Sequence, residues 1–192
     1  MKLAVDMDGV VANTVPLMVK AIEKRGFIVV FDRYNPYIDG IQDTEELMYE
    51  VVEEVYSAQM DQIQPYEDTV KSIHLISRDL GFITFVTARR EKFNAATLKW
   101  LHDHFDISFD FINKPSSEKP SFILQEEFDV FIEDRLRTVN IAAELGIKTY
   151  LINRQWNTGR TTHKDIVRVN SLAEFYAIEM LFKSCFYSVE VK

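Results

Sequence analysis

Two acidic side chains stand close together in the segment VDMDGVVANT (residues 5–14). Asp6 and Asp8 directly follow an apolar run at 3–5. Neighbouring carboxylates repel each other and resist burial, so a fold that keeps such a pair needs a compensating group. A divalent cation or a phosphoryl group would compensate them, and the segment therefore indicates metal or phosphate chemistry.

The two aspartates suit two roles in phosphoryl transfer. A carboxylate can attack phosphorus and carry the group as an aspartyl-phosphate, which divides hydrolysis into two easier steps. Asp6, the last residue of an expected strand at 2–6, is the candidate nucleophile. Side chains alternate along an extended chain, so Asp8 points to the same side and can protonate the leaving alkoxide and then deprotonate water. Gly9 lets the backbone turn close to a phosphate.

Mg²⁺ is the expected cofactor for such a nucleophile. The charge of Asp6 repels an incoming phosphate, and Mg²⁺ bound by oxygen ligands neutralises the two. The residues assigned to the metal are Asp6, Asp8 and Asp134, and Asp134 ends the segment VFIED (130–134) next to Glu133.

Two further segments supply candidates for binding the phosphate. Thr87 ends an apolar run and Ala88 follows it, while Lys114 and Lys119 both come after the next run along the chain. A hydroxyl and an ammonium can hold phosphate oxygens where charge concentrates in the transition state. The sequence therefore predicts a phosphate site made from several strand ends.

The elements that position these residues are short β-branched or aromatic runs that alternate with longer stretches of helical period, which is typical of an α/β fold. The expected strands are 2–6, 82–87, 109–113, 130–134, 148–153 and 165–169, and the expected helices are 91–105, 118–128, 138–146 and 171–184. Nearly continuous apolar runs indicate parallel strands that are covered on both faces. In such sheets ligands bind beyond the carboxyl ends of the strands, where the candidate residues stand.

An insertion interrupts this alternation. About 75 residues separate the first strand from the second, far more than one crossover helix needs. The segment 43–60 carries an apolar face at helical spacing with Asp43 as its expected cap, whereas 27–42 is expected to be irregular. The expected division is a Rossmann-like core at 1–14 and 78–192 and a small helical cap at 15–77.

Composition sets limits on partners and location. The 192 residues are 47% hydrophobic and carry a net charge of -8, which argues against stable binding to nucleic acid or to an anionic membrane. Cys185 is the only cysteine, so no internal disulfide is expected and a reducing, cytoplasmic setting fits best. The expected partner is a small phosphorylated substrate, a nucleotide first of all, and a monomer and a homodimer both stay open.

Together these segments resemble the four motifs of the haloacid dehalogenase superfamily of phosphohydrolases: DxD followed by Gly and Val, an apolar run ending in Thr, a Lys, and an acidic pair after a fourth strand. The insertion falls where that superfamily places its first type of cap. The resemblance implies a sheet order of 3-2-1-4-5, which would bring Asp6, Asp8 and Asp134 together. Within the superfamily, DMDGVVANT, FIEDR and LINRQWN (151–157) are similar to the 5′(3′)-deoxyribonucleotidase branch.

The resemblance also assigns individual residues. Lys119 is preferred to Lys114 because it opens a helix that leads toward the fourth strand, as the third motif requires. Glu133 stands where the superfamily has Asp, so Asp134 is expected to bind the metal directly and Glu133 to support the metal's ligands.

Substrate recognition is expected to fall on residues around this site. Asn13 and Thr14 stand where the branch carries an acidic residue and an aromatic residue, and Arg89 comes just after the second motif. Trp156 lies in the loop after the fifth strand, where a base can stack. Further candidates in the insertion are Arg33, Tyr34 and Tyr37.

The function expected from these residues is Mg²⁺-dependent hydrolysis of a phosphomonoester through an aspartyl-phosphate, with a 5′-nucleotidase or deoxyribonucleotidase acting on nucleoside monophosphates as the first interpretation. A sugar-phosphate phosphatase and a 3′-phosphatase acting on nucleic-acid ends are alternatives within the superfamily. A phosphoacceptor switch and a binding protein without turnover are alternatives of another class. Turnover separates them, because an enzyme releases many phosphates per chain and a switch at most about one before it is reset.

Overall fold

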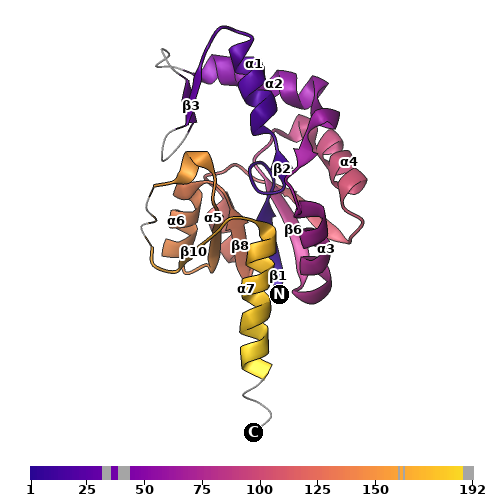
Figure 1. Ribbon diagram of the computed structural model, residues 1–192, viewed down its shortest axis with the longest axis vertical. Coiled ribbons are helices and arrows are strands. Elements are labelled where there is room, and N and C mark those ends of the chain that lie inside the picture. Colours follow the sequence, from indigo (N-terminus) through magenta and orange to yellow (C-terminus); the bar gives the residue numbers. More distant parts are fainter. Residues whose placement is uncertain (32–35, 39–43, 160, 162, 188–192) are drawn as a thin grey trace.

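The computed structural model describes residues 1–31, 36–38, 44–159, 161 and 163–187. Six parallel strands form the central sheet (Figure 1). They are β1 (Lys2–Asp6), β6 (Phe82–Thr87), β7 (Phe109–Asn113), β8 (Val130–Glu133), β9 (Thr149–Ile152) and β10 (Ile166–Val169). Their order across the sheet is β10-β9-β8-β1-β6-β7.

This order confirms the expected arrangement 3-2-1-4-5, with one more strand, β10, at the edge beside β9. The central strand β1 pairs with β6 on one side and with β8 on the other. Leu3, Ala4 and Val5 of β1 are fully buried, because helices cover both faces of the sheet. That burial explains why the strand reads as a continuous apolar run.

Helices pack on both faces of the sheet (Figure 1). They are α3 (Thr69–Asp79), α4 (Asn94–His104), α5 (Lys119–Gln125), α6 (Leu136–Glu144) and α7 (Leu172–Tyr187), of which the last four correspond to the expected helices. Ile73 of α3 joins the core cluster of Val5, whereas Ile123 of α5 joins that of Ala4. Successive side chains of a strand point to opposite faces, so α3 and α5 cover opposite faces. Within the described ranges, no helix combines the length and the apolar character that crossing a bilayer requires.

The described residues between β1 and α3 include two packed helices and two short antiparallel strand pairs. These elements are β2 (Ala12–Asn13), α1 (Val15–Glu23), β3 (Val29–Phe31), β4 (Pro36–Ile38), α2 (Glu45–Ala58) and β5 (Gln64–Pro65). β3 pairs with β4, so part of the stretch expected to be irregular is regular. β2 pairs with β5, and the chain therefore leaves and rejoins the core through one ladder. Figure 1 shows α1, α2 and β3 beyond the carboxyl end of β1.

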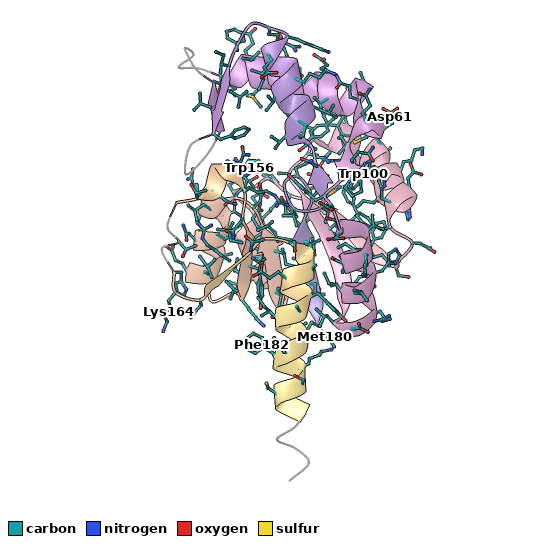
Figure 2. All side chains as sticks on the ribbon, viewed as in Figure 1. Asp61, Trp100, Trp156, Lys164, Met180 and Phe182 are labelled. Atoms are coloured by element: carbon teal, nitrogen blue, oxygen red, sulfur yellow. The ribbon has the colours of Figure 1, made fainter. Side chains whose placement is uncertain are left out.

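The limits of the insertion are set by its contacts with the core. α3 packs against α7 and the sheet, so a cap boundary at residue 77 divides a helix of the core layer, and the division into core and cap stays a prediction. Trp100 of α4 donates its indole N–H to the carbonyl of Ile63 at 2.8 Å, which ties the returning chain to the core (Figure 2). Outside the described residues lie Arg33, Tyr34 and Asp43, and the side chain of Tyr37 is not described either.

Two substitutions in α3 test its packing on the sheet. Ile73 is fully buried, and Ile73→Ala should lower the free energy of unfolding by about 2–5 kcal/mol because it leaves a cavity. Val70 on the same helix is 36% exposed, so Val70→Ala should change that energy by about 0.5 kcal/mol or less. Urea denaturation followed by circular dichroism measures both, and equal effects would contradict the packing.

Candidate active site

Three carboxyl groups meet at the carboxyl ends of β1 and β8. Asp6 is the last residue of β1, Glu133 is the last residue of β8, and Asp134 follows it. Because Val5 pairs with Ile132 in the parallel ladder, the ends of the two strands lie side by side. The three side chains are buried, and each offers an oxygen within 4.8 Å of the others. Carboxylates this close require protonation or positive charge beside them, from a basic side chain or a bound cation.

Lys119 lies against this acidic cluster. It is the first residue of α5, it is buried, and its ammonium donates to Asp6 Oδ1 and, at 3.3 Å, to Glu133 Oε2. The ammonium of Lys114, the alternative phosphate-binding lysine, instead lies 5.2 Å from the centre of the Phe122 ring. Of the two lysines, the structure therefore brings Lys119 to Asp6.

Both oxygens of Glu133 already have donors. Oε1 accepts the backbone N–H groups of Asp134 at 3.0 Å and of Arg135 at 3.1 Å, and Oε2 accepts Lys119. Glu133 is fully buried, so these bonds replace the water that its charge has lost. They hold Lys119 and the loop after β8 in place, which suits the supporting role that the sequence assigns to Glu133.

Asp134 has one satisfied oxygen and one unsatisfied oxygen. Trp156, which Figure 2 shows where the core meets the insertion, donates its indole N–H to Oδ2 at 2.7 Å. Oδ1 is buried and has no hydrogen-bond partner among the described residues. An unpaired buried oxygen is costly, so it marks a place for a ligand. Carboxylate oxygens are the ligands that hard divalent cations prefer, and Asp6 and Asp134 therefore fit Mg²⁺.

Gly9 makes room for Asp134. Its φ is +86°, a conformation that residues with a side chain rarely adopt. A Cβ at this position would also lie 2.1 Å from Asp134 Oδ2. The sequence predicts that the backbone passes close to a phosphate here, and the structure adds that it passes close to a carboxylate.

Asp8 stands apart from the acidic cluster and pairs with Arg89. The guanidinium donates from Nε to Asp8 Oδ2 at 2.9 Å and from Nη2 to Oδ1 at 2.6 Å. Arg89 is itself buried, donates to Thr97 Oγ1 at 3.2 Å, and lies 4.6 Å from the centre of the Tyr56 ring. A bidentate pair holds the carboxylate in one orientation. Arg89, a candidate for substrate contact, is therefore engaged with Asp8, and the Asp8 carboxylate lies outside the cluster that fits a metal.

Burial raises the pKa values of the acidic cluster. The pKa of Asp6 rises from 3.8 to about 8, first because its carboxyl group is buried and then because Glu133 is close, although Lys119 opposes the rise. The pKa of Asp134 rises from 3.8 to about 6, again because of burial first and of the Asp6 charge second. Burial also raises the pKa of Glu133. Without a metal, Asp6 thus keeps its proton near neutral pH.

A cleft of about 310 Å³ opens in front of the nucleophile candidate. Asp6, Asp8, Ala88 and Lys119 line it, together with Arg89. Its walls come from β1, α2, α5 and the loops after β6, β7 and β8, so the insertion contributes one side. The cleft therefore gives a ligand access to both aspartates of the DxD motif.

A second pocket of about 650 Å³ contains Trp156 and Asn13, two of the candidates for substrate contact. Phe31 of β3 lies on its wall, with its ring centre 5.9 Å from that of Trp156. Trp156 also contacts Asp134, so this pocket lies one side chain away from the acidic cluster.

Two predicted site residues lie away from the cavities. Thr87 is fully buried, and its Oγ1 accepts the backbone N–H of Arg89 at 3.2 Å. Thr14 is buried where α1 begins. Neither is among the described residues that line the cleft or the second pocket.

Sequence reasoning missed several residues around the cleft. Tyr56 is identified from the sequence only as part of the apolar face of a helix, and nothing there indicates its contact with Arg89. Arg135 lines the cleft and comes directly after the acidic pair, a position that is a usable signal. Ser116, which also lines the cleft, has no such signal.

The sequence matches no protein-family model and no curated protein sequence. Solved structures share the fold. A haloacid dehalogenase-like protein from Bacteroides fragilis has a TM-score of 0.62 and 14% identity, with 91% of this chain and 98% of that chain covered. CbbY from Rhodobacter sphaeroides in complex with phosphate has a TM-score of 0.56 and 14% identity, with 91% and 95% covered. D,D-heptose 1,7-bisphosphate phosphatase from B. bronchiseptica, complexed with magnesium and phosphate, has a TM-score of 0.55 and 13% identity, with 96% and 99% covered. The chain therefore has the α/β fold of these proteins, a parallel sheet flanked by helices.

Two glycine substitutions separate backbone strain from collision with Asp134. Gly9 and Gly26 have φ of +86° and +84°, but a Cβ at Gly26 meets nothing within 4 Å. Gly26→Ala should cost about 1–2 kcal/mol of unfolding free energy from the backbone alone. Gly9→Ala should cost about 1–3 kcal/mol more, because the new methyl group displaces Asp134. Denaturant unfolding measures both, and equal losses would contradict the collision.

Mg²⁺ and pH should act together on stability. The pKa of Asp6 is about 8 in the fold against 3.8, so between these pH values the folded protein holds a proton that the unfolded chain has released. The contribution of Asp6 to metal-free stability should therefore fall as pH rises from about 4 to about 8. Mg²⁺ favours the ionised carboxylates, so it should raise the melting temperature more near pH 8 than near pH 5.5. Differential scanning fluorimetry with MgCl₂ or EDTA measures this.

Asp6→Asn is the control for that experiment, because an amide does not titrate in this range. Its metal-free melting temperature should fall less between these pH values, and its response to Mg²⁺ should be smaller. A wild-type response to Mg²⁺ of the same size at both pH values would refute the assignment of Mg²⁺ to this cluster.

Proposed function

We propose that this chain is a Mg²⁺-dependent phosphomonoesterase of the haloacid dehalogenase superfamily that acts through an aspartyl-phosphate on Asp6. The observation that carries the proposal is the buried group at the ends of β1 and β8, in which Asp6 meets Lys119 beside an unpaired oxygen of Asp134. Burying such a group costs stability compared with apolar packing, so a function best accounts for it. Solved structures of the same fold contain phosphate, and one also contains magnesium, which supports the proposal.

In the first half-reaction a carboxylate oxygen of Asp6 attacks phosphorus while the bond from phosphorus to the leaving oxygen breaks, and Asp8 gives its proton to that oxygen. Asp6 and Asp134 would hold Mg²⁺, which would supply positive charge to offset that of the nucleophile and the phosphate. The ammonium of Lys119 stabilises the oxygens of the phosphoryl group during transfer. The products are a free alcohol and a phosphorylated Asp6.

In the second half-reaction water attacks the phosphorus, and Asp8, now a carboxylate, takes the proton of that water. The bond from phosphorus to Asp6 breaks, which releases inorganic phosphate and restores both aspartates. The carboxyl group of Asp8 thus acts as the general acid in the first step and as the general base in the second. The bidentate pair with Arg89 orients the ionised carboxylate that this second step uses.

A sugar phosphate is the substrate class that the solved structures support. One of them is named as a phosphatase of D,D-heptose 1,7-bisphosphate. Nucleoside monophosphates, the first interpretation of the sequence, have no such support among these proteins. Sugar phosphates, an alternative from the sequence, therefore become the leading proposal.

A nucleotide is the second candidate because of the pocket beside Asp134. The rings of Phe31 and Trp156 form one aromatic wall of this pocket, and the side chains of Asn13 and Asn153 supply polar groups. Its volume of about 650 Å³ suits a ligand of nucleoside size. A base stacked on that wall would place the sugar and phosphate toward the acidic cluster.

Phosphate release decides between these classes. With Mg²⁺, turnover is expected on sugar phosphates, and 5′- and 3′-nucleoside monophosphates test the second candidate. Excess EDTA should abolish turnover, and Asp6→Asn should lower kcat by at least about a thousandfold because its amide cannot carry the phosphoryl group. Asp110→Asn, a change at an exposed residue of β7, is the matched control and should keep wild-type activity.

Turnover on nucleotides alone would replace sugar phosphates by the second candidate and leave the chemistry unchanged. Release of at most about one phosphate per chain would indicate a phosphoacceptor switch. No release from any ester would refute the proposed activity and favour a binding protein. A 3′-phosphatase of nucleic-acid ends conflicts with the net charge of -8.

A further inference from the structure

The cleft in front of Asp6 contains more cationic than acidic side chains. Its charged lining residues are Asp6, Asp8, Arg89, Arg90, Lys119 and Arg135. This surplus is local, because the whole chain has a net charge of -8. Cations gathered in one cleft of an acidic protein attract an anionic ligand.

Two of these cations already have acidic partners. Lys119 contacts Asp6 and Glu133, and Arg89 donates two hydrogen bonds to Asp8. Both serve the aspartates of the proposed reaction. The surplus of positive charge therefore comes from the other two arginines.

Arg135 has a neutral hydrogen-bond partner. Its Nη1 donates to Ser116 Oγ at 2.9 Å, and it forms no ion pair with a carboxylate of the described residues. Glu133 interacts with its charge, but both oxygens of Glu133 already accept Lys119 and backbone amides. The Ser116 hydroxyl accepts from Arg135 and keeps its own proton for another acceptor. Together the two side chains offer several donors to the cleft.

Arg90 is only partly neutralised. Its Nη1 lies 3.5 Å from Glu53 Oε2, an oxygen that also accepts the ammonium of Lys92. The guanidinium stacks on Tyr49, 3.8 Å from the ring centre. One carboxylate shared by two cations leaves positive charge at this side of the cleft.

We propose that Arg135 and Ser116, with Arg90, form a second anion-binding subsite, and that the substrate has a second acidic group, a phosphate or a carboxylate, besides the phosphate that is transferred. The inference rests on the proposed function, because Asp6 determines where the transferred phosphate lies. That phosphate meets Lys119, so the guanidinium of Arg135 and the partly neutralised guanidinium of Arg90 are left for a group further along the substrate. The planar fork of arginine matches two oxygens of either anion.

Hydrolysis of p-nitrophenyl phosphate gives a readout that does not depend on the natural substrate. The competing ligands are matched pairs that differ in one acidic group: glycerol 3-phosphate and 3-phosphoglycerate, glucose 6-phosphate and glucose 1,6-bisphosphate, AMP and adenosine 3′,5′-bisphosphate. In at least one pair the second acidic group should lower the inhibition constant about tenfold or more. The pair that responds shows whether the subsite takes a carboxylate or a phosphate.

Arg135→Gln should reduce that preference to about twofold or less, because a neutral amide replaces the charged donor. Arg137→Gln is the matched control and should keep the wild-type preference. Arg137 lies in the first turn of α6, two residues after Arg135, is exposed and is not a lining residue of the cleft. Equal constants within every wild-type pair would overturn the subsite. So would an Arg135→Gln variant that weakens both members of each pair equally, because Arg135 would then bind the transferred phosphate.

The failure of the proposed function has a different signature. If the wild-type protein hydrolyses no phosphate ester, the enzymatic proposal fails. The subsite is then tested by calorimetric titration of the same ligand pairs into wild type, Arg135→Gln and Arg137→Gln, which gives dissociation constants in place of inhibition constants. A preference that Arg135→Gln alone removes would still support the subsite. Equal affinities would overturn it.

Discussion

The burial of three carboxyl groups at the ends of β1 and β8 is the constraint on which the rest of the site depends. Asp6, Glu133 and Asp134 have lost water, and burial raises the pKa of each. Lys119 contacts two of them and supplies the positive charge that offsets their repulsion. Removing one partner of a buried ion pair destabilises a protein strongly, because the remaining charge is then buried without compensation. Electrostatics as well as apolar packing therefore determines where α5 begins.

The same constraint reaches the surrounding loops. The loop after β8 gives two backbone N–H groups to Glu133, and the loop after β9 brings the Trp156 indole to Asp134. The loop after β1 has Gly9 where any side chain would collide with Asp134, and Arg154 donates to the Gly9 carbonyl at 2.7 Å. Loops from three strands are thus held by polar contacts with the cluster or with one another. These polar contacts add to apolar packing, since Met7, Val10 and Val11 of the loop after β1 are buried in the core.

The parallel α/β class is predictable from the apolar runs, because parallel strands covered on both faces read as such runs and place their carboxyl ends at one edge. The strand order, and with it the meeting of Asp6 and Asp134, follows from the resemblance to the four superfamily motifs. Pairings between individual side chains are not predictable in the same way. Asp8 and Arg89 are 81 positions apart, and their contact depends on the turn after β6 and on a helix of the insertion packed beside it. A tryptophan can stack its ring on a ligand or donate its indole N–H to an acceptor, and the sequence does not decide between the two. The path of the loop after β9 brings the indole N–H of Trp156 to Asp134.

The charged groups that take part in the proposed chemistry are oriented before any ligand arrives. Asp6 has Lys119 and Asp8 has Arg89, so binding does not have to reorganise them. Two groups among the described residues in and beside the cleft keep binding capacity for a ligand. The Oδ1 oxygen of Asp134 has no hydrogen-bond partner and suits a cation. The guanidinium of Arg135 has only a neutral partner and suits an anion. One lies within the buried cluster and the other on the exposed wall of the cleft. Chemistry and specificity therefore rest on different groups, and the residues of the wall can change without disturbing the buried charges.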